Sequence, residues 1–263
     1  KIGSSGWNAL HLASIAGNLD CVKSLVEAGA KAKEVNAEGY TALNNAAANG
    51  HADVVRYLLT QRVDVDHQDS VMKWSALHVA AAGGFTEIAR LLISAGADVN
   101  LEDGTAWTPM HHACRQGQTD VVKLLVDKGA KLDKTIEDEN EEAALHLAAK
   151  FGHEAVVRIL LSKDIDLNIK DKNDHTPLHL AVIASNEGIV RALLAKKAKL
   201  NVKDEKGNTP LHYAVMANLE GIAELLARSG ARQDIENRNS ETVIQMARNK
   251  YGILNILGKY KKD

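Results

Sequence analysis

A tetrapeptide close to T-P-L-H recurs eight times along this 263-residue chain, and its spacing restricts the fold more than any other feature. The copies begin at Asn8, Thr41, Ser75, Thr108, Ala143, Thr176, Thr209 and Thr242. Successive copies are therefore 33 to 35 residues apart. A unit of this length is one supersecondary element, which cannot bury its own apolar face and must stack on its neighbours. The spacing predicts a solenoid of eight repeats, and solenoids mostly bind other molecules.

Each repeat continues after the tetrapeptide in the same way, as the segment 75–100 shows with SALHVAAAGGFTEIARLLISAGADVN. Two small residues are followed by a turn near glycine, an apolar helix and a second turn. Small residues on the first helix would let adjacent repeats approach closely, and they recur at Ala13, Ala46, Ala80, Ala113, Ala148, Ala181, Ala214 and Ala247. The second helix has apolar residues at helical spacing, such as Val121 and Leu125, which we expect to form a continuous core.

These motifs resemble the ankyrin repeat from about Gly6 to the C-terminus. The resemblance implies an all-α ankyrin-repeat solenoid of stacked helix-turn-helix units with short inter-repeat hairpins. We expect residues 1–263 to form one such domain, a piece of a larger protein, with the last repeat as its C-terminal cap. Glycine follows the second helix in four repeats, where a left-handed residue ends a helix at low cost. Arg62, Asp164 and Lys197 occupy that position elsewhere, so we expect strain at those junctions.

Composition restricts the partners and the compartment. The formal net charge is only −2, so no overall field attracts nucleic acid. No apolar run is long enough to span a membrane, and we predict no membrane insertion. Cys21 and Cys114 are the only cysteines, which favours a reducing compartment. We therefore expect a cytoplasmic monomer, with the nucleus as the alternative location.

The eleven histidines raise the possibility of a metal or acid-base site. Six of them are the fourth letter of the tetrapeptide, namely His11, His78, His111, His146, His179 and His212. The ankyrin resemblance implies that these histidines are structural and join neighbouring turns by hydrogen bonds. His153-Glu154 begins like a zinc-protease helix, but Val157 stands where the second histidine is needed. No phosphate-binding loop or nucleophile motif is present. We predict no catalysis, no metal site and no cofactor.

The position directly before each tetrapeptide is where ankyrin-repeat proteins commonly contact their partners. We call it the register position; it holds Trp7, Tyr40, Trp74, Trp107, Glu142, His175, Asn208 and Glu241. Aromatic residues make up only 4% of the chain, yet the first four register residues are all aromatic. Tryptophan and tyrosine supply large contact areas and are favoured at binding hot spots. We predict that these four rings line a partner-binding groove outside the helical core, so that removing them leaves stability nearly unchanged. The alternative is that they pack on neighbouring hairpins.

Further candidates lie beside these rings. Asn49, Arg115 and Phe151 end the first helices of their repeats and would form the groove wall. The hairpin before Ala143 is enlarged, and its carboxylates include Glu139, Glu141 and Glu142. These acids would suit a basic segment of a partner through ion pairing and cation-π contact, or they are simply a solvated tip.

Three asparagines and two departures from the repeat pattern complete the candidates. Asn100, Asn168 and Asn201 resemble ankyrin asparagines that a dioxygenase hydroxylates, although a turn-forming role is favoured. Asn45 and His112 replace the apolar residue that follows the tetrapeptide in most other repeats. Such polar groups cost stability if they are unpaired.

The sequence as a whole favours a protein-protein interaction module that binds a partner segment in this groove. One alternative is a targeting or substrate-recruiting domain of a larger enzyme or effector. Another is a reader of a basic or methylated-lysine peptide, with Trp74, Trp107 and the acidic hairpin around the cation.

Overall fold

The computed structural model describes residues 5–136 and 140–260 of the chain. Over these residues it contains sixteen α-helices and no β-strand. Isolated antiparallel bridges join the hairpin arms at Val35 with Thr41 and at Thr135 with Ala143. The all-α solenoid of helix-turn-helix units predicted from the spacing is confirmed.

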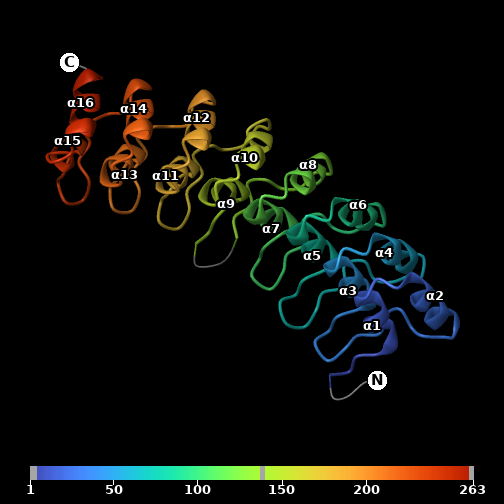
Figure 1. Ribbon diagram of the computed structural model, residues 1–263. Coiled ribbons are helices and arrows are strands. Elements are labelled where there is room, and N and C mark those ends of the chain that lie inside the picture. Colours follow the sequence, from blue (N-terminus) through green and yellow to red (C-terminus); the bar gives the residue numbers. More distant parts are fainter. Residues whose placement is uncertain (1–4, 137–139, 261–263) are drawn as a thin grey trace. The chain divides into compact units, whose positions relative to one another are not determined.

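The helices alternate along the chain between the first and the second helix of a repeat (Figure 1). Their bounds are α1 Ala9–Ile15, α2 Leu19–Glu27, α3 Ala42–Ala48, α4 Ala52–Leu59, α5 Ala76–Gly83, α6 Thr86–Ser94, α7 Pro109–Gln116, α8 Thr119–Asp127, α9 Ala144–Lys150, α10 Glu154–Leu160, α11 Pro177–Ile183, α12 Glu187–Ala195, α13 Pro210–Met216, α14 Glu220–Arg228, α15 Val243–Met246 and α16 Tyr251–Lys259. Each of the eight tetrapeptides begins at the N-cap of the first helix of its repeat.

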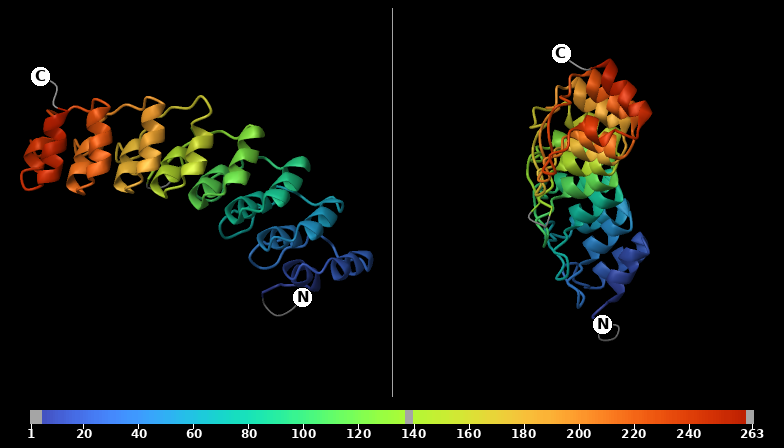
Figure 2. Two further views of the ribbon diagram at one scale, coloured as in Figure 1. Left: turned by 45° about the horizontal axis from the view of Figure 1, so that its top comes forward. Right: turned by 90° about the vertical axis from the view of Figure 1, so that its left-hand side faces the viewer.

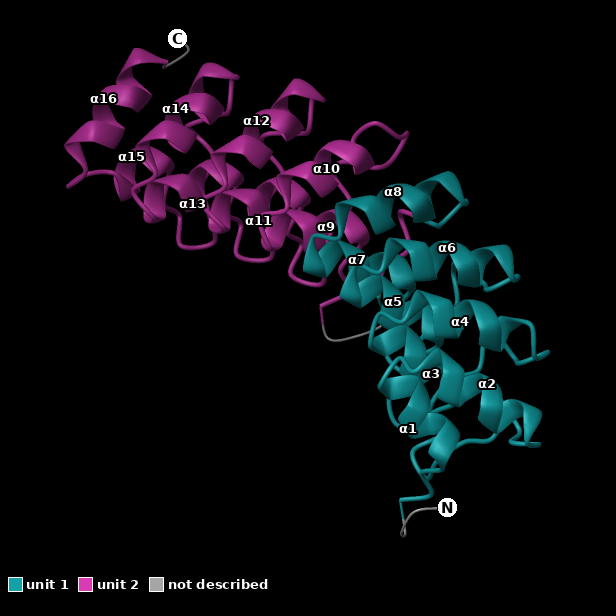
Figure 3. Ribbon diagram, turned by 45° about the vertical axis from the view of Figure 1, so that its right-hand side comes forward, with its two compact units in different colours: residues 1–131, 136–138 teal, residues 132–135, 139–263 magenta. Residues whose placement is uncertain are grey.

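The chain divides into two compact units (Figure 3). The first comprises residues 1–131 and 136–138 and contains α1 to α8. The second comprises residues 132–135 and 139–263 and contains α9 to α16. All four aromatic register residues belong to the first unit.

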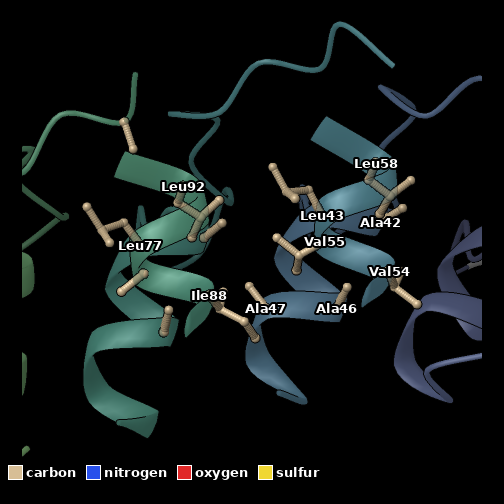
Figure 4. Close-up of a cluster of buried hydrophobic side chains, with 14 of the residues drawn as sticks. Ala42, Leu43, Ala46, Ala47, Val54, Val55, Leu58, Leu77, Ile88 and Leu92 are labelled. Atoms are coloured by element: carbon tan, nitrogen blue, oxygen red, sulfur yellow. The ribbon is translucent and has the colours of Figure 1, made fainter. Parts of the chain in front are cut away.

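Within the first unit, the first helices α1, α3, α5 and α7 pack in sequence, and the second helices α2, α4, α6 and α8 pack in a parallel row (Figure 2). Ala46, Ala80 and Ala113 on the first helices are fully buried, as the small-residue pattern predicts. The second helices fill the core with larger side chains such as Ile88 and Leu92 (Figure 4). Alanine at the contacts lets neighbouring helices approach while the second helices supply the buried apolar area.

The second unit follows the same plan, with α9, α11, α13 and α15 in one row and α10, α12, α14 and α16 in the other. Its alanines Ala148, Ala181 and Ala214 are fully buried. The last helix, α16, buries Ile253 and Leu257 against α14.

The tetrapeptide histidines join each repeat to the hairpin that follows it. In the first unit, His78 Nδ1 accepts a hydrogen bond from the Ser75 N–H at 3.1 Å, while Nε2 lies 3.0 Å from the Leu101 carbonyl oxygen and 3.2 Å from that of Trp107. A carbonyl oxygen only accepts, so Nε2 carries the proton and the ring is neutral. Four other histidines reach a following carbonyl in the same way: His11 to Glu34, His146 to His175, His179 to Asn208 and His212 to Glu241. The structural role predicted for these histidines is confirmed.

Asn44 stands in the histidine position of the second repeat and makes the equivalent bonds. Its Oδ1 accepts from the Thr41 N–H at 3.1 Å, and its Nδ2 donates to the His67 carbonyl at 3.4 Å. An amide therefore replaces the imidazole here because it also offers one acceptor and one donor.

Turns between the elements use left-handed backbone at recurring positions. The turn between the two helices has glycine in five repeats, at Gly17, Gly50, Gly84, Gly117 and Gly152. After the second helix, Arg62 and Lys197 are left-handed, with φ of 53° and 64°, as the missing glycines predict. Asp164 is not left-handed, so the strain predicted at that junction is wrong. Ser185 and Asn218 replace the inter-helix glycine and are also left-handed, each with φ of 56°. The left-handed backbone at these two residues was not predicted from the sequence. A non-glycine residue in this region costs roughly 1 kcal/mol.

The buried histidines predict that the protein loses stability in mild acid. Burial lowers the pKa of both His78 and His179 to about 4. In the unfolded chain their pKa is about 6.5, so protonation favours the unfolded state. Their stabilising contribution is complete above pH 6.5 and decreases as the pH falls to about 4. At about 1.4 kcal/mol per pKa unit, the loss approaches about 3 kcal/mol for each histidine. Urea unfolding at a series of pH values measures it.

The variant His78→Asn provides the control, because Asn44 shows that this fold accepts asparagine there. Its free energy of unfolding should vary less steeply between pH 6.5 and pH 4 than that of the parent. Equal slopes for the two proteins would show that His78 is not held neutral in the folded state.

Candidate partner-binding site

Three of the aromatic register residues, Tyr40, Trp74 and Trp107, donate their backbone N–H to a buried side-chain oxygen near the start of the same hairpin tip. Asn36 Oδ1 accepts from the Tyr40 N–H at 2.9 Å, and Asp103 Oδ1 accepts from the Trp107 N–H at 3.0 Å. In the third repeat, one inserted residue lengthens the tip, and Asp69 Oδ2 accepts from the Trp74 N–H at 2.8 Å. These bonds fix the ends of the hairpins, so the register side chains start from defined positions.

Two of the predicted rings meet around one histidine. The centroid of the Trp74 ring lies 4.4 Å from that of the His112 ring in an edge arrangement. The centroid of the Trp107 ring lies 5.1 Å from that of the same His112 ring in a tilted arrangement. His112 comes from α7, one repeat after Trp74. We call Trp74, His112 and Trp107 the aromatic cluster. Edge and tilted ring contacts at these distances are favourable beyond their buried area.

A carboxylate completes the aromatic cluster. His112 Nε2 donates to Asp103 Oδ2 at 2.9 Å, and both residues are buried. Burial alone would raise the pKa of Asp103, but hydrogen bonds from His112, Thr105 and Trp107 outweigh it and lower the pKa to about 2. His112, which stands where most repeats have an apolar residue, is therefore hydrogen-bonded to Asp103. Asn45, the other departure, keeps a buried Nδ2 without a hydrogen-bond partner.

Arg115 covers the outer side of the aromatic cluster. Its guanidinium carbon lies 5.5 Å from the centroid of the Trp107 ring, while the side chain is otherwise exposed on α7. Trp107 is consequently only 9% exposed. The expectation that the register rings stand outside the core is wrong for Trp107, because His112 and Arg115 enclose it. Trp74 is half-buried and keeps part of its ring accessible.

The other predicted residues of the first unit are more open. Trp7 is half-buried and contacts the ring of His11 at 5.7 Å. Tyr40 is also half-buried; burial, and then the charges of Asp69 and Glu38, raise the pKa of its hydroxyl. Asn49 is exposed at the end of α3.

The remaining predicted residues belong to the second unit. Phe151 is 44% exposed, and its role in a groove stays a prediction. Glu142 is 3% exposed and accepts from Lys150 Nζ at 3.0 Å, so its predicted role as a carboxylate for a basic partner is wrong. Glu141 is exposed, with a left-handed φ of 53°. Glu139 lies outside the described residues.

The three asparagines compared with hydroxylated ones form an inter-repeat ladder. Asn100 Oδ1 accepts from the Lys131 N–H at 2.8 Å, Asn168 Oδ1 from the Lys199 N–H at 2.7 Å, and Asn201 Oδ1 from the Arg232 N–H at 2.9 Å. These bonds support the turn-forming role. Modification of these residues stays a prediction.

Sequence reasoning missed a second polar cluster, which lies in the second unit. His175 Nδ1 lies 3.2 Å from Asp171 Oδ2, and its Nε2 lies 3.3 Å from the Tyr213 hydroxyl. Tyr213 donates to Asp204 Oδ2. Burial would lower the pKa of His175, but the Asp171 hydrogen bond and the charges of Asp171 and Asp204 raise it. The sequence does contain a pattern that indicates this cluster. His175 is in the register position and Tyr213 follows it by 38 residues, the same separation as between Trp74 and His112.

Two further kinds of feature are absent from residues 5–136 and 140–260. No group of three or more histidine, cysteine, aspartate or glutamate side chains is arranged to hold a metal ion there. No helix in the same described ranges is long and apolar enough to cross a bilayer.

Family models match the whole chain, and individual relatives match about a quarter of it. The family model for ankyrin repeats in three copies matches residues 1–69, 62–136, 132–204 and 188–263. Notch-regulated ankyrin repeat-containing protein A of Danio rerio is 49% identical over 61 residues, which are 23% of this chain and 54% of that protein. Protein phosphatase 1 regulatory subunit 27 of Homo sapiens is 43% identical over 65 residues, 25% of this chain and 42% of that protein. The matches thus span about half the length of these relatives.

The enclosed position of Trp107 predicts that it stabilises the fold. Trp107→Ala removes a ring packed between His112 and Arg115, and we expect a loss of about 3 to 5 kcal/mol in the free energy of unfolding. Trp7→Ala, at a half-buried ring, should cost less. Urea denaturation of the two variants checks the order. If Trp107→Ala unfolds at the same urea concentration as the parent, the ring is not part of the packed structure.

Proposed function

Because the chain belongs to the ankyrin-repeat family, we propose that it is a protein-interaction module that binds a segment of a partner protein. The observation that carries the proposal is the aromatic cluster of the first unit. The half-buried Trp74 is held by the bond from its N–H to Asp69 and by the ring of His112, next to Trp107 and the exposed Arg115. Tryptophan and arginine are the residues most often found at binding hot spots.

The surroundings of the cluster leave space for a partner. The ends of the neighbouring first helices expose small or short side chains, Ala48 and Asn49 on the α3 side and Gly83 on the α5 side. A surface of this kind needs little rearrangement, so most of the ordering cost of binding falls on the partner. Trp7 and Tyr40 would extend the contact along the register positions of the first unit.

The relatives support protein binding as the general function. One of them is named as a regulatory subunit of protein phosphatase 1, and a subunit acts in association with other proteins. A role for this chain as the recruiting domain of a larger protein would use the same surface. We propose that the module itself has no catalytic activity and that residues 1–263 act as one binding domain.

The charge of the partner is a separate part of the proposal. The carboxylates of Glu141 and Glu139 in the enlarged hairpin would attract a basic segment. Glu142 is excluded from this surface because its side chain is buried. A methylated-lysine reader is disfavoured at Trp107, because the Arg115 cation occupies the ring face that such a ligand would need.

The test uses exposed positions, so that folding and binding are separated. Arg115→Ala and Asn49→Arg should each weaken partner binding, the first by about 30-fold on the scale of a hot spot. Arg90→Ala is the matched control, because Arg90 is an exposed arginine on the second-helix row of the same unit. Affinity capture followed by mass spectrometry compares the parent with the three variants.

A partner retained by the parent and by Arg90→Ala but lost from Arg115→Ala and Asn49→Arg supports the site. Capture of the same proteins by all four forms contradicts it. Unfolding measurements on each variant confirm that any loss is not caused by a damaged fold.

A further inference from the structure

The second unit contains a hollow of about 400 Å³ that none of the roles above uses. It lies between the hairpin tips at residues 205–208 and 237–241, with Met216 and Met246 among its lining residues. These tips belong to the loops before α13 and before α15 (Figure 1). We propose that this hollow binds an aromatic side chain, tryptophan or tyrosine, presented by a loop of a partner protein. The proposal is independent of the aromatic cluster in the first unit.

The hollow exists because Asn208 and Met246, which have no rings, occupy positions that hold rings in two other repeats. Two register residues pack against the ring 38 positions later, Trp74 on His112 and His175 on Tyr213. The corresponding pair here is Asn208 and Met246, which brings no ring. The partner's ring would take the place that the chain's own ring takes elsewhere.

The walls of the hollow are held before any partner arrives. The Asn208 N–H donates to Asp204 Oδ1 at 2.7 Å, and the Arg238 N–H donates to the Lys206 carbonyl at 2.9 Å. Asn237 Nδ2 donates to Asn208 Oδ1 at 3.1 Å and so joins the two tips. A preformed site of this size is in the range of known ligand pockets and avoids an ordering cost on this side.

The chemistry of the lining favours a neutral aromatic ring over an aliphatic or charged side chain. Met216 is 41% exposed and Met246 is half-buried, and thioether sulfur makes favourable contacts with ring edges. The rim carries two carboxylates, Glu205 and Glu241, and two cations, Lys206 and Arg238. Since these charges balance, a charged side chain gains little at the centre. The exposed Glu241 can accept a hydrogen bond from an indole N–H or a phenol O–H.

The four methionines of the chain make the proposal directly observable. Protein labelled with ¹³C at the methionine methyl groups gives signals from Met72, Met110, Met216 and Met246. Titration with N-acetyl-tryptophanamide should shift the Met216 and Met246 signals through the ring current of the indole, with a dissociation constant on the order of 1 mM. Met72 and Met110 lie in the first unit and should not move. N-acetyl-leucinamide should give shifts that are smaller for the same two signals.

Two variants test the location of the site. Asn208→Trp fills the hollow with the chain's own ring and should abolish the shift, whereas Asn173→Trp adds the same residue at an exposed tip and should leave it intact. Met216→Glu changes only an exposed side chain and should weaken binding by about tenfold, as judged from the Met246 signal.

The proposal is overturned if Met216 and Met246 do not respond to about 10 mM of the tryptophan compound. It is equally overturned if Asn208→Trp and Met216→Glu bind as the parent does, or if leucine and tryptophan compounds act alike. Because Arg115→Ala leaves this hollow untouched, failure here and failure of the first-unit site are distinguishable.

Discussion

The buried histidine of the tetrapeptide, present in six of the eight repeats, is the residue on which the positions of the following hairpins depend. Its Nδ1 accepts from the backbone at the start of its own helix, and its Nε2 donates to the next hairpin. In four cases the accepting carbonyl belongs to the register residue itself: Trp107, His175, Asn208 and Glu241. In these repeats the histidine therefore fixes the backbone of the register residue of the next repeat. Protonation would remove the acceptor and break one of the two bonds.

With the backbone fixed in this way, the side chain at the register position decides what each repeat presents. A tryptophan beside His112 gives the packed aromatic cluster, partly open at Trp74. A glutamate at position 142 gives an ion pair between its buried carboxylate and the exposed Lys150. An asparagine opposite Met246 leaves a hollow. A single variable position on an otherwise constant repeat thus yields three different surfaces.

The repeats, the helices and the structural histidines could be predicted from the sequence because they depend on contacts that recur at a fixed period. The exposure of the register residues could not be predicted, because it depends on particular partners. Trp107 is enclosed by His112 and Arg115, and neither side chain alone indicates that a ring is covered. In the sequence, Glu142 is one of several acids in a charged hairpin, and nothing there indicates that Lys150, eight residues later, binds its carboxylate. Reading pairs of residues 38 positions apart would have found the contacts of Trp74 and His175 and the gap at Asn208.

The protonation state of the tetrapeptide histidines tests this account most directly. Two-bond ¹⁵N–¹H correlation spectra of ¹⁵N-histidine protein distinguish the two neutral tautomers from the charged ring. The account predicts that His78 and His179 are neutral at pH 7, with the proton on Nε2, and stay so below pH 6 because burial lowers the pKa of each to about 4. Rings protonated on Nδ1, or charged at pH 6, would contradict it.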